Sequence, residues 1–225
     1  RGLVFGAKYP GKTHEVLTQL AINLALAHSA PSSQSPSLLD PMAGRGTTLL
    51  WASRYGIDAD GLELDPKAII DFQREVKKQT KLEKIKHNYS GGRLPHLKKS
   101  SDGSFSEFRF KESASRLIQG DSRDLAKFVG QKRRYTLIVS DLPYGVQHFA
   151  GKERSPLNSL QDCAVNWVRA LRAGGAMVLI FNSFLPKRHE IVGLFEPLGL
   201  NLAPQSFEHR VSESIRRELV IFRKA

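Results

Sequence analysis

The chain has 225 residues, 40% of them apolar, and its 34 Lys and Arg against 22 Asp and Glu give a formal net charge of +12. A chain of this length buries about three quarters of its unfolded surface, so we expect one domain over 1–225 that needs no disulfide or metal to fold. The single cysteine, Cys163, excludes a disulfide framework and a cysteine-rich zinc site. The histidines after His14 have no metal-ligand spacing with one another or with Cys163, so no metal site is expected.

No apolar stretch approaches the length of about 20 residues that a bilayer crossing needs, so a membrane partner is excluded. No cleavable targeting segment opens the chain, and a reducing cytoplasm is the expected compartment. The chain begins at Arg1 rather than Met, which suggests that further sequence precedes it.

Helical and strand-like segments alternate along the chain. A leading amphipathic helix over 13–28 is N-capped by Thr13. The other predicted helices cover 47–55, 66–79, 157–171 and 189–195. The predicted strands cover 38–40, 59–64, 116–120, 135–140, 176–181, 201–211 and 217–223. This order predicts an α/β fold with a seven-stranded, mostly parallel sheet, a C-terminal antiparallel hairpin, and helices on both faces.

One stretch, 81–115, does not fit this alternation. It is polar and rich in Lys, Gly and Ser, and it is too long for an ordinary connection, so it is interpreted as an insertion or mobile loop. The segment from Arg74 to Arg116 contains twelve Lys or Arg and five Asp or Glu, so it contributes +7 to the net charge of +12.

Four acidic residues lie at the carboxyl ends of four of the predicted strands. They are Asp40, Glu63, Asp121 and Asp141. In sheets of this kind, ligands bind outside the carboxyl ends of the strands, near the point where the strand order reverses. The four acids are therefore candidates for one binding site.

The segment Asp40-Pro-Met-Ala-Gly-Arg-Gly-Thr47 combines a strand end, a glycine turn and a helix start, which lets backbone N–H groups approach a ligand closely. A P-loop is disfavoured because no Lys follows Gly46, and Leu49 in place of a third Gly weakens a dinucleotide site without excluding it. S-adenosylmethionine is the favoured ligand: the turn, with Gly44, Gly46 and Thr47, suits its carboxylate and ammonium beside Asp40.

Two further strand ends complete this cofactor hypothesis. Glu63 lies nineteen residues after Gly44, a separation suited to an acid that binds ribose hydroxyls. Asp65 is a rival for that role, but its position before Pro66 marks it as a helix cap. Asp121, followed by Ser122, can accept from the adenine amino group; the alternative is a cap for the turn at 122–128.

The segment Ser140-Asp-Leu-Pro-Tyr-Gly145 is the most specific chemical motif. The amino group of a base is a poor nucleophile, so methyl transfer to it needs acceptors that bind both N–H bonds and aim the lone pair at the methyl donor. The Asp141 carboxylate and the Leu142 carbonyl can be those acceptors, Pro143 makes the turn rigid, and Tyr144 offers a ring for stacking. The alternative is a structural turn in which Asp141 is a cap and Tyr144 a core residue.

Together these segments resemble a known family. The matching motifs are Asp40–Thr47, Gly61–Asp65, Gln119–Asp121 and Ser140–Gly145. They are similar to the motifs of class I S-adenosylmethionine-dependent methyltransferases and, more narrowly, to RNA guanine-N2 methyltransferases that usually carry a THUMP domain. The resemblance implies a Rossmann-like class I methyltransferase fold. The chain departs from the family in lacking a THUMP domain and in carrying the insertion, so an N-terminal RNA-binding domain is expected outside these residues.

Within that branch, Tyr9-Pro-Gly-Lys-Thr-His14 resembles a segment that packs beside the amino-acid end of the cofactor. The resemblance implies that Thr13 and His14 line the site, although a solvated first-turn position explains His14 equally well. Leu142 stands where the wider amino-methylating group has Pro, a variant associated with the tRNA-modifying branch.

The resulting hypothesis is a methyltransferase that acts on the N2 amino group of guanosine in structured RNA, with tRNA as partner. The alternatives are a DNA adenine-N6 methyltransferase, a protein glutamine methyltransferase, and a non-catalytic RNA-binding module. Phosphate contacts are expected from the basic insertion and from Lys132, Arg133, Arg134, Lys152, Arg154, Arg216 and Arg217. The sequence does not indicate the oligomeric state.

Overall fold

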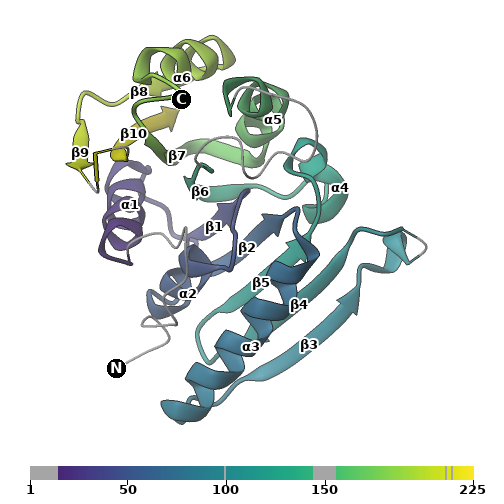
Figure 1. Ribbon diagram of the computed structural model, residues 1–225. Helices are drawn as coiled ribbons and strands as arrows, with labels where there is room; N and C mark the ends of the chain where they lie inside the picture. Colours follow the sequence, from purple (N-terminus) through teal and green to yellow (C-terminus); the bar gives the residue numbers. More distant parts are fainter. Residues whose placement is uncertain (1–14, 99, 144–155, 211, 214) are drawn as a thin grey trace.

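The computed structural model describes residues 15–98, 100–143, 156–210, 212–213 and 215–225 (Figure 1). The strands are β1 (Ser37–Asp40), β2 (Asp58–Glu63), β3 (Asn88–Arg93), β4 (Ser104–Arg109), β5 (Ala114–Gln119), β6 (Tyr135–Asp141), β7 (Leu171–Asn182), β8 (Leu200–Leu202), β9 (Phe207–Arg210) and β10 (Arg216–Lys224). The helices are α1 (Glu15–His28), α2 (Thr47–Arg54), α3 (Pro66–Leu82), α4 (Leu125–Val129), α5 (Pro156–Ala170) and α6 (Arg188–Phe195).

All ten described strands form one sheet in the order β3-β4-β5-β2-β1-β6-β7-β10-β8, and β9 pairs with β10. The five central strands, from β5 to β7, are parallel, and the strands at both ends pair antiparallel. Strand β1 pairs with β2, the next strand in the chain, on one side and with β6 on the other. The strand order therefore reverses between β1 and β6, which is where sheets of this type bind ligands.

The predicted fold class is confirmed: the sheet is mostly parallel, helices cover both faces, and an antiparallel hairpin ends the chain. The sheet is wider than the seven strands predicted for two reasons. The insertion contributes β3 and β4, and the strand expected over 201–211 is divided into β8 and β9. Pro204, which has no N–H to donate to a neighbouring strand, lies in that interruption.

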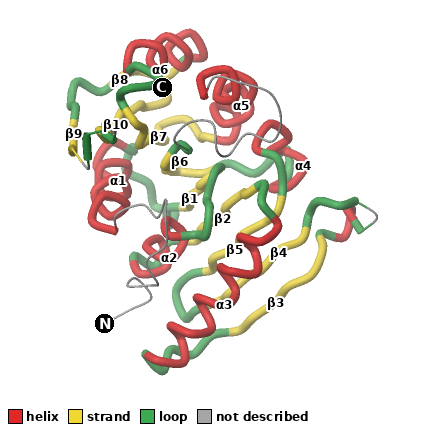
Figure 2. Tube along the Cα trace, in the orientation of Figure 1, coloured by secondary structure: helices red, strands yellow, loops and turns green. Residues whose placement is uncertain are grey.

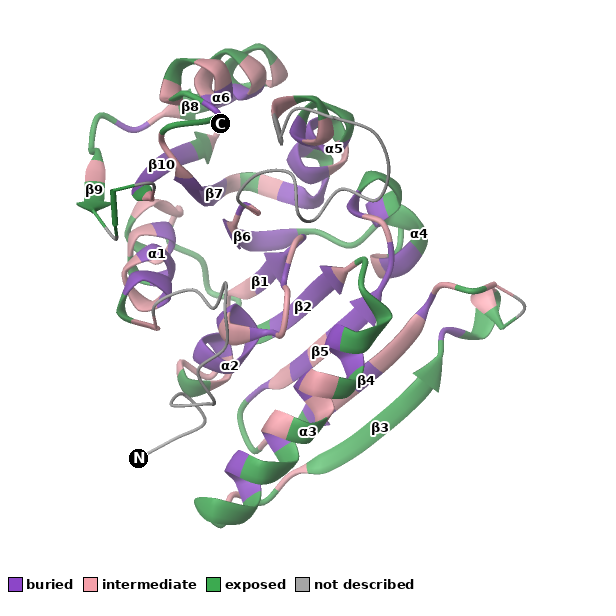
Figure 3. Ribbon diagram, viewed as in Figure 1, coloured by how far each residue is buried: buried purple, intermediate pink, exposed green. Residues whose placement is uncertain are grey.

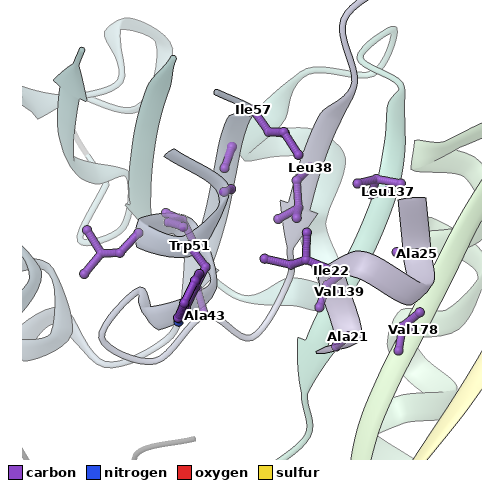
Figure 4. Packing of buried hydrophobic residues seen from close by; sticks show 14 of the residues in the cluster. Ala21, Ile22, Ala25, Leu38, Ala43, Trp51, Ile57, Leu137, Val139 and Val178 are labelled. Carbon is purple, nitrogen blue, oxygen red and sulfur yellow. The ribbon is translucent and has the colours of Figure 1, made fainter. Parts of the chain in front are cut away.

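Each face of the sheet has its own hydrophobic core. One core joins the sheet to α1, α2 and α3, and the other joins it to α4, α5 and α6. Figure 4 shows the first of these, with side chains of α1 over those of β1, β6 and β7: Ala21, Ile22, Ala25, Leu38, Leu137, Val139 and Val178. Because the central strands are covered on both sides, β6 and β7 contain the apolar runs that buried parallel strands usually have, whereas β2 and β5 also carry polar residues such as Asp60 and Arg116.

The insertion is ordered rather than a loop, and it widens the sheet beside α3 (Figures 1 and 2). Phe108 of β4 is fully buried and packs edge-on against Phe72 of α3, with ring centroids 5.8 Å apart. Strand β3 is the outer edge, and all of its residues are exposed (Figure 3). The interpretation of 81–115 as a mobile loop is therefore wrong for its described residues, because Phe108 anchors the hairpin to the helix.

Among the described residues, no helix is both long and apolar enough to span a membrane.

Candidate functional site

The carboxyl ends of β2, β1 and β6 lie side by side and carry three of the four predicted acids. Asp40 ends β1, which pairs with β2 on one side and with β6 on the other. Glu63 ends β2 and Asp141 ends β6. The structure thus brings Asp40, Glu63 and Asp141 to one edge of the sheet, at the reversal of strand order.

The glycine turn after β1 is held from both sides. The Ala43 N–H donates to the Leu62 carbonyl at 2.8 Å, and the Gly46 N–H donates to the Ala43 carbonyl at 2.8 Å. Gly44 and Gly46 have φ values of 51° and 79°, a region that side chains disfavour, and Gly46 is the N-cap of α2, which begins at Thr47. A Cβ on Gly46 would lie 2.6 Å from the Phe72 ring, whereas a Cβ on Gly44 would meet nothing within 4 Å. The turn is therefore packed on the Gly46 side and open at Gly44.

Glu63 connects this turn to the start of α3. Its Oε2 accepts from the Gly44 N–H at 2.9 Å and its Oε1 accepts from the Asp65 N–H at 3.0 Å. Asp65 in turn accepts from the Lys67 N–H at 2.9 Å, which confirms that Asp65 is the N-cap of α3. Glu63 is half-buried.

Asp40 is almost completely buried, with 2% of its surface exposed. The Ser140 hydroxyl donates to its Oδ1 at 2.8 Å, and the Met42 N–H donates to the same oxygen at 3.2 Å. Burial raises the pKa of the Asp40 carboxyl from 3.8 to about 7, although hydrogen bonds from Ser140, Thr48 and Met42 act in the opposite direction. Asp40 therefore changes its charge near neutral pH.

Asp141 is paired with an arginine. Arg217 Nη1 of β10 donates to Asp141 Oδ2 at 3.1 Å, and the two side chains are 7% and 13% exposed. The next residue, Leu142, is buried and its N–H donates to the Ile180 carbonyl at 2.8 Å, which continues the pairing with β7. The sheet thus fixes Asp141 and Leu142 of the segment Ser140–Gly145, and the carboxylate of Asp141 has a cationic partner.

Asp121 and Ser122 lie past the end of β5, and both have structural partners. Asp121 accepts from the Arg123 N–H at 2.9 Å and forms an ion pair with the Arg123 guanidinium. The hydrogen bond from Arg123 lowers the pKa of the Asp121 carboxyl. Ser122 Oγ accepts from Trp167 Nε1 at 2.8 Å. The capping alternative for Asp121 is therefore confirmed, and a contact with adenine would have to share this carboxylate with Arg123.

Arg217 was expected to bind phosphate, and that expectation is wrong because its side chain is buried against Asp141. Side chains alternate between the two faces of a strand, so the two consecutive arginines point to opposite faces of the sheet. The side chain of Arg216 is 50% exposed. The apolar residues at 219–222 predict a buried strand, which is the signal that an adjacent arginine could be buried as well.

Three predicted site residues, Thr13, His14 and Tyr144, lie outside the described residues, as do Lys152 and Arg154. Within the described part of the chain, no three His, Cys, Asp or Glu side chains form a group that could hold a metal ion.

Comparison with known proteins gives no match to a protein-family model and no match among curated proteins. Solved structures do match. TrmN from Thermus thermophilus is 17% identical with a TM-score of 0.61; the match covers 96% of this chain and 50% of TrmN. Magnesium protoporphyrin IX methyltransferase (ChlM) from Synechocystis PCC 6803, crystallised with bound S-adenosylmethionine, is 10% identical with a TM-score of 0.59 and coverage of 94% and 80%.

An rRNA methylase from Streptococcus thermophilus is 10% identical with a TM-score of 0.54, and the match covers 94% of this chain and 97% of that enzyme. The chain has the class I methyltransferase fold. It spans half the length of TrmN. In this methyltransferase fold, the turn at 41–46 joins the first central strand to its helix, and Asp141 ends the strand on the other side of the reversal.

The asymmetry of the glycine turn gives a matched pair of variants. Gly44→Ala places a Cβ in open space and adds only the strain of a positive φ, so we expect a loss of about 1 kcal/mol in the free energy of unfolding. Gly46→Ala adds the clash with Phe72, and we expect about 2–4 kcal/mol. Urea denaturation measures both. Equal losses in the two variants would contradict the packing described. In a protein that already carries Phe72→Leu, the loss caused by Gly46→Ala should be smaller, because the clashing ring is gone.

The raised pKa of Asp40 makes stability depend on pH. Between about pH 4 and pH 7 the folded protein retains a proton on Asp40 that the unfolded chain has released, so stability falls as the pH rises through this window. In Asp40→Asn, residue 40 is uncharged at every pH, so this variant lacks the pH dependence that Asp40 causes. We expect the unfolding free energy of the wild type, relative to Asp40→Asn, to fall by about 4 kcal/mol between pH 4 and pH 7. Parallel pH curves for the two proteins would show that Asp40 titrates normally.

Proposed function

We propose that the chain is an S-adenosylmethionine-dependent methyltransferase that methylates an exocyclic amino group in RNA. The observation that supports this most directly is the placement of the glycine turn, held by Glu63, beside the Asp141 carboxylate at adjacent strand ends. The fold shared with ChlM and with an rRNA methylase agrees with both parts of the proposal.

The residues of the turn fit the cofactor. At Gly44 the turn is open, because a Cβ there would meet nothing within 4 Å, and Glu63 lies beside it with a partly exposed carboxylate. Glu63 would accept from the ribose hydroxyls, while Asp40 and the turn would hold the amino-acid end, whose ammonium favours the ionised form of Asp40. When bound, S-adenosylmethionine supplies an electrophilic methyl group on a sulfonium.

Asp141 then acts on the acceptor. An amino group conjugated with a base has a delocalised lone pair, and acceptors that bind its N–H bonds localise that pair and aim it. The Asp141 carboxylate and the Leu142 carbonyl supply two acceptors on consecutive residues at the end of β6. The ion pair with Arg217 places a cation beside the Asp141 carboxylate, and an ionised carboxylate can only accept hydrogen bonds.

The finer substrate assignment rests on the sequence motif and on charge. The segment Ser140–Gly145 resembles that of the tRNA-modifying guanine-N2 methyltransferases, and a net charge of +12 suits a polyanionic substrate. We therefore propose guanine N2 in tRNA as the methylated group. DNA adenine N6 and protein glutamine present a similar planar amino group, so the substrate must be distinguished by assay.

Transfer of a labelled methyl group tests the proposal. The protein is incubated with labelled S-adenosylmethionine and, separately, with total tRNA, with duplex DNA and with extract protein from which nucleic acid has been removed. We expect label in tRNA, recovered as N2-methylguanosine after digestion to nucleosides. Label in DNA or protein alone would replace the RNA assignment, and an absence of cofactor binding by calorimetry would favour the non-catalytic alternative.

Variants at Asp141 separate chemistry from cofactor binding. Asp141→Ala and the isosteric Asp141→Asn remove the anionic acceptor, so we expect kcat to fall about 10²- to 10⁴-fold. The Kd for S-adenosylmethionine should stay within a few fold, because Glu63 and the turn are untouched. If cofactor affinity falls together with turnover, Asp141 is a cofactor ligand and the proposed role is incorrect.

Arg217 is a positioning residue for Asp141, and its test compares kcat with cofactor affinity. Arg217→Gln removes the guanidinium that fixes the Asp141 carboxylate, so we expect kcat to fall about 10²-fold while the Kd for S-adenosylmethionine stays within a few fold. Arg217→Lys keeps the charge and should retain most of the wild-type kcat. Because breaking a buried ion pair also costs stability, melting curves identify the folded fraction. A wild-type kcat per folded Arg217→Gln enzyme would mean that Arg217 is only structural.

A further inference from the structure

Helix α3 carries a row of exposed cations along one face. They follow one another at spacings of seven and then three or four residues, which places them on the same side of the helix. We call this set the α3 ridge; it consists of Lys67, Arg74, Lys77, Lys78 and Lys81, all exposed.

The charges of the α3 ridge are not neutralised by neighbouring acids. Among the described residues, none of the ridge cations forms an ion pair with a carboxylate. The two acids of α3 are half-buried and have other partners: Asp71 pairs with Arg45 at 3.2 Å, and Glu75 accepts from Gln79 at 2.9 Å. Two exposed acids lie at the ends of the helix, Asp65 at the N-cap and Glu83 at the C-cap.

Some cations near α3 have partners within the protein. Arg109 pairs with Glu107 at 2.6 Å, and Arg93 donates to backbone carbonyls of the hairpin loop, including that of Ser101. On β5, Arg116 pairs with Asp60 at 2.8 Å. Other cations of the insertion are exposed and form no ion pair among the described residues: Lys84, Lys86, Lys98 and Lys111. The expectation that the insertion supplies phosphate contacts stays a prediction, and the α3 ridge adds to it a regular row of unpaired cations on one helix.

The ridge begins at the candidate site and leads away from it. Lys67 donates its N–H to the Asp65 cap, and the Asp65 N–H donates to Glu63. From Lys67 to Lys81 the helix rises by about 21 Å, which corresponds to about six phosphates along one strand of a duplex. Phe72 and Val76 pack the opposite side of α3 into the core, so the row of cations is held on a rigid helix.

We propose that the α3 ridge binds the phosphodiester backbone of the RNA whose nucleotide enters the site, and this inference rests on the proposed function. A straight row of uncompensated cations that starts at the site matches the regular charges of such a backbone. A membrane surface fits less well, because a helix that binds lipid inserts an extended apolar face. The apolar face of α3, including Ile69 and Phe72, is buried in the protein, and Ile70 and Leu82 are the only exposed large apolar side chains of this helix.

Binding of total tRNA at several KCl concentrations, followed by fluorescence anisotropy without cofactor, tests the ridge. Lys78→Gln/Lys81→Gln removes two ridge charges. The matched control, Arg169→Gln/Arg223→Gln, removes two exposed charges from α5 and β10. We expect the slope of log K against log salt to become shallower by about 1.5–2 in the ridge variant, and to stay at the wild-type value in the control. Equal slopes in the two variants would overturn the proposal.

Two further arms separate this inference from the proposed function. If the ridge variant methylates tRNA with a wild-type KM, the methyltransferase proposal stands and the ridge proposal is incorrect. If tRNA binding depends on the ridge but no RNA is methylated, the ridge proposal stands without the activity. Vesicles containing phosphatidylglycerol provide the last arm, and a ridge-dependent affinity for them above that for tRNA would overturn the RNA assignment.

Discussion

The Glu63 carboxylate connects the parts of the molecule on which the site depends. Its two oxygens accept from the Gly44 N–H of the turn after β1 and from the Asp65 N–H at the start of α3. The Gly120 N–H at the end of β5 donates to the backbone carbonyl of Glu63. One residue thus fixes a glycine turn, a helix start and the end of a neighbouring strand, and the packing of Gly46 against Phe72 fixes the turn from its other side.

The two carboxylates on either side of the strand reversal are stabilised differently. Asp40 lies in the interior with hydroxyl and backbone donors only, and burial raises its pKa to about 7. Asp141 is nearly as buried but faces the guanidinium of Arg217. The charge of Asp141 adds to the effect of burial in raising the pKa of Asp40. The pairing with Arg217 places a cation beside Asp141, the residue proposed to bind the methyl acceptor.

The sequence predicts the convergence of Asp40, Glu63 and Asp141 because the carboxyl ends of parallel strands meet at one edge of a sheet. The sequence also predicts that Asp65 caps α3, because Asp65 directly precedes Pro66 at the start of the helix. Arg217 was assigned to the surface because a pair of arginines suggests solvent, and only the register of β10 against β7 shows which one points inward. Strand β3 was missed because all of its residues are exposed, so it has no apolar alternation, and its place in the sheet depends on Phe108 of the next strand.

The distribution of ion pairs changes what the net charge means. A cation that is bonded to a carboxylate of the same protein contributes little to the attraction of an external polyanion, because the pair is nearly neutral at a distance. Arg109, Arg116 and Arg123 are of this kind and serve the sheet and the turn after β5. Phe72 and Val76 anchor α3 from the side opposite the α3 ridge, and of the ridge cations Lys77 also contacts β3, with its Nζ 4.4 Å from the centroid of the Tyr89 ring. Charge that the fold does not use is the part of the +12 that is free to act on a partner.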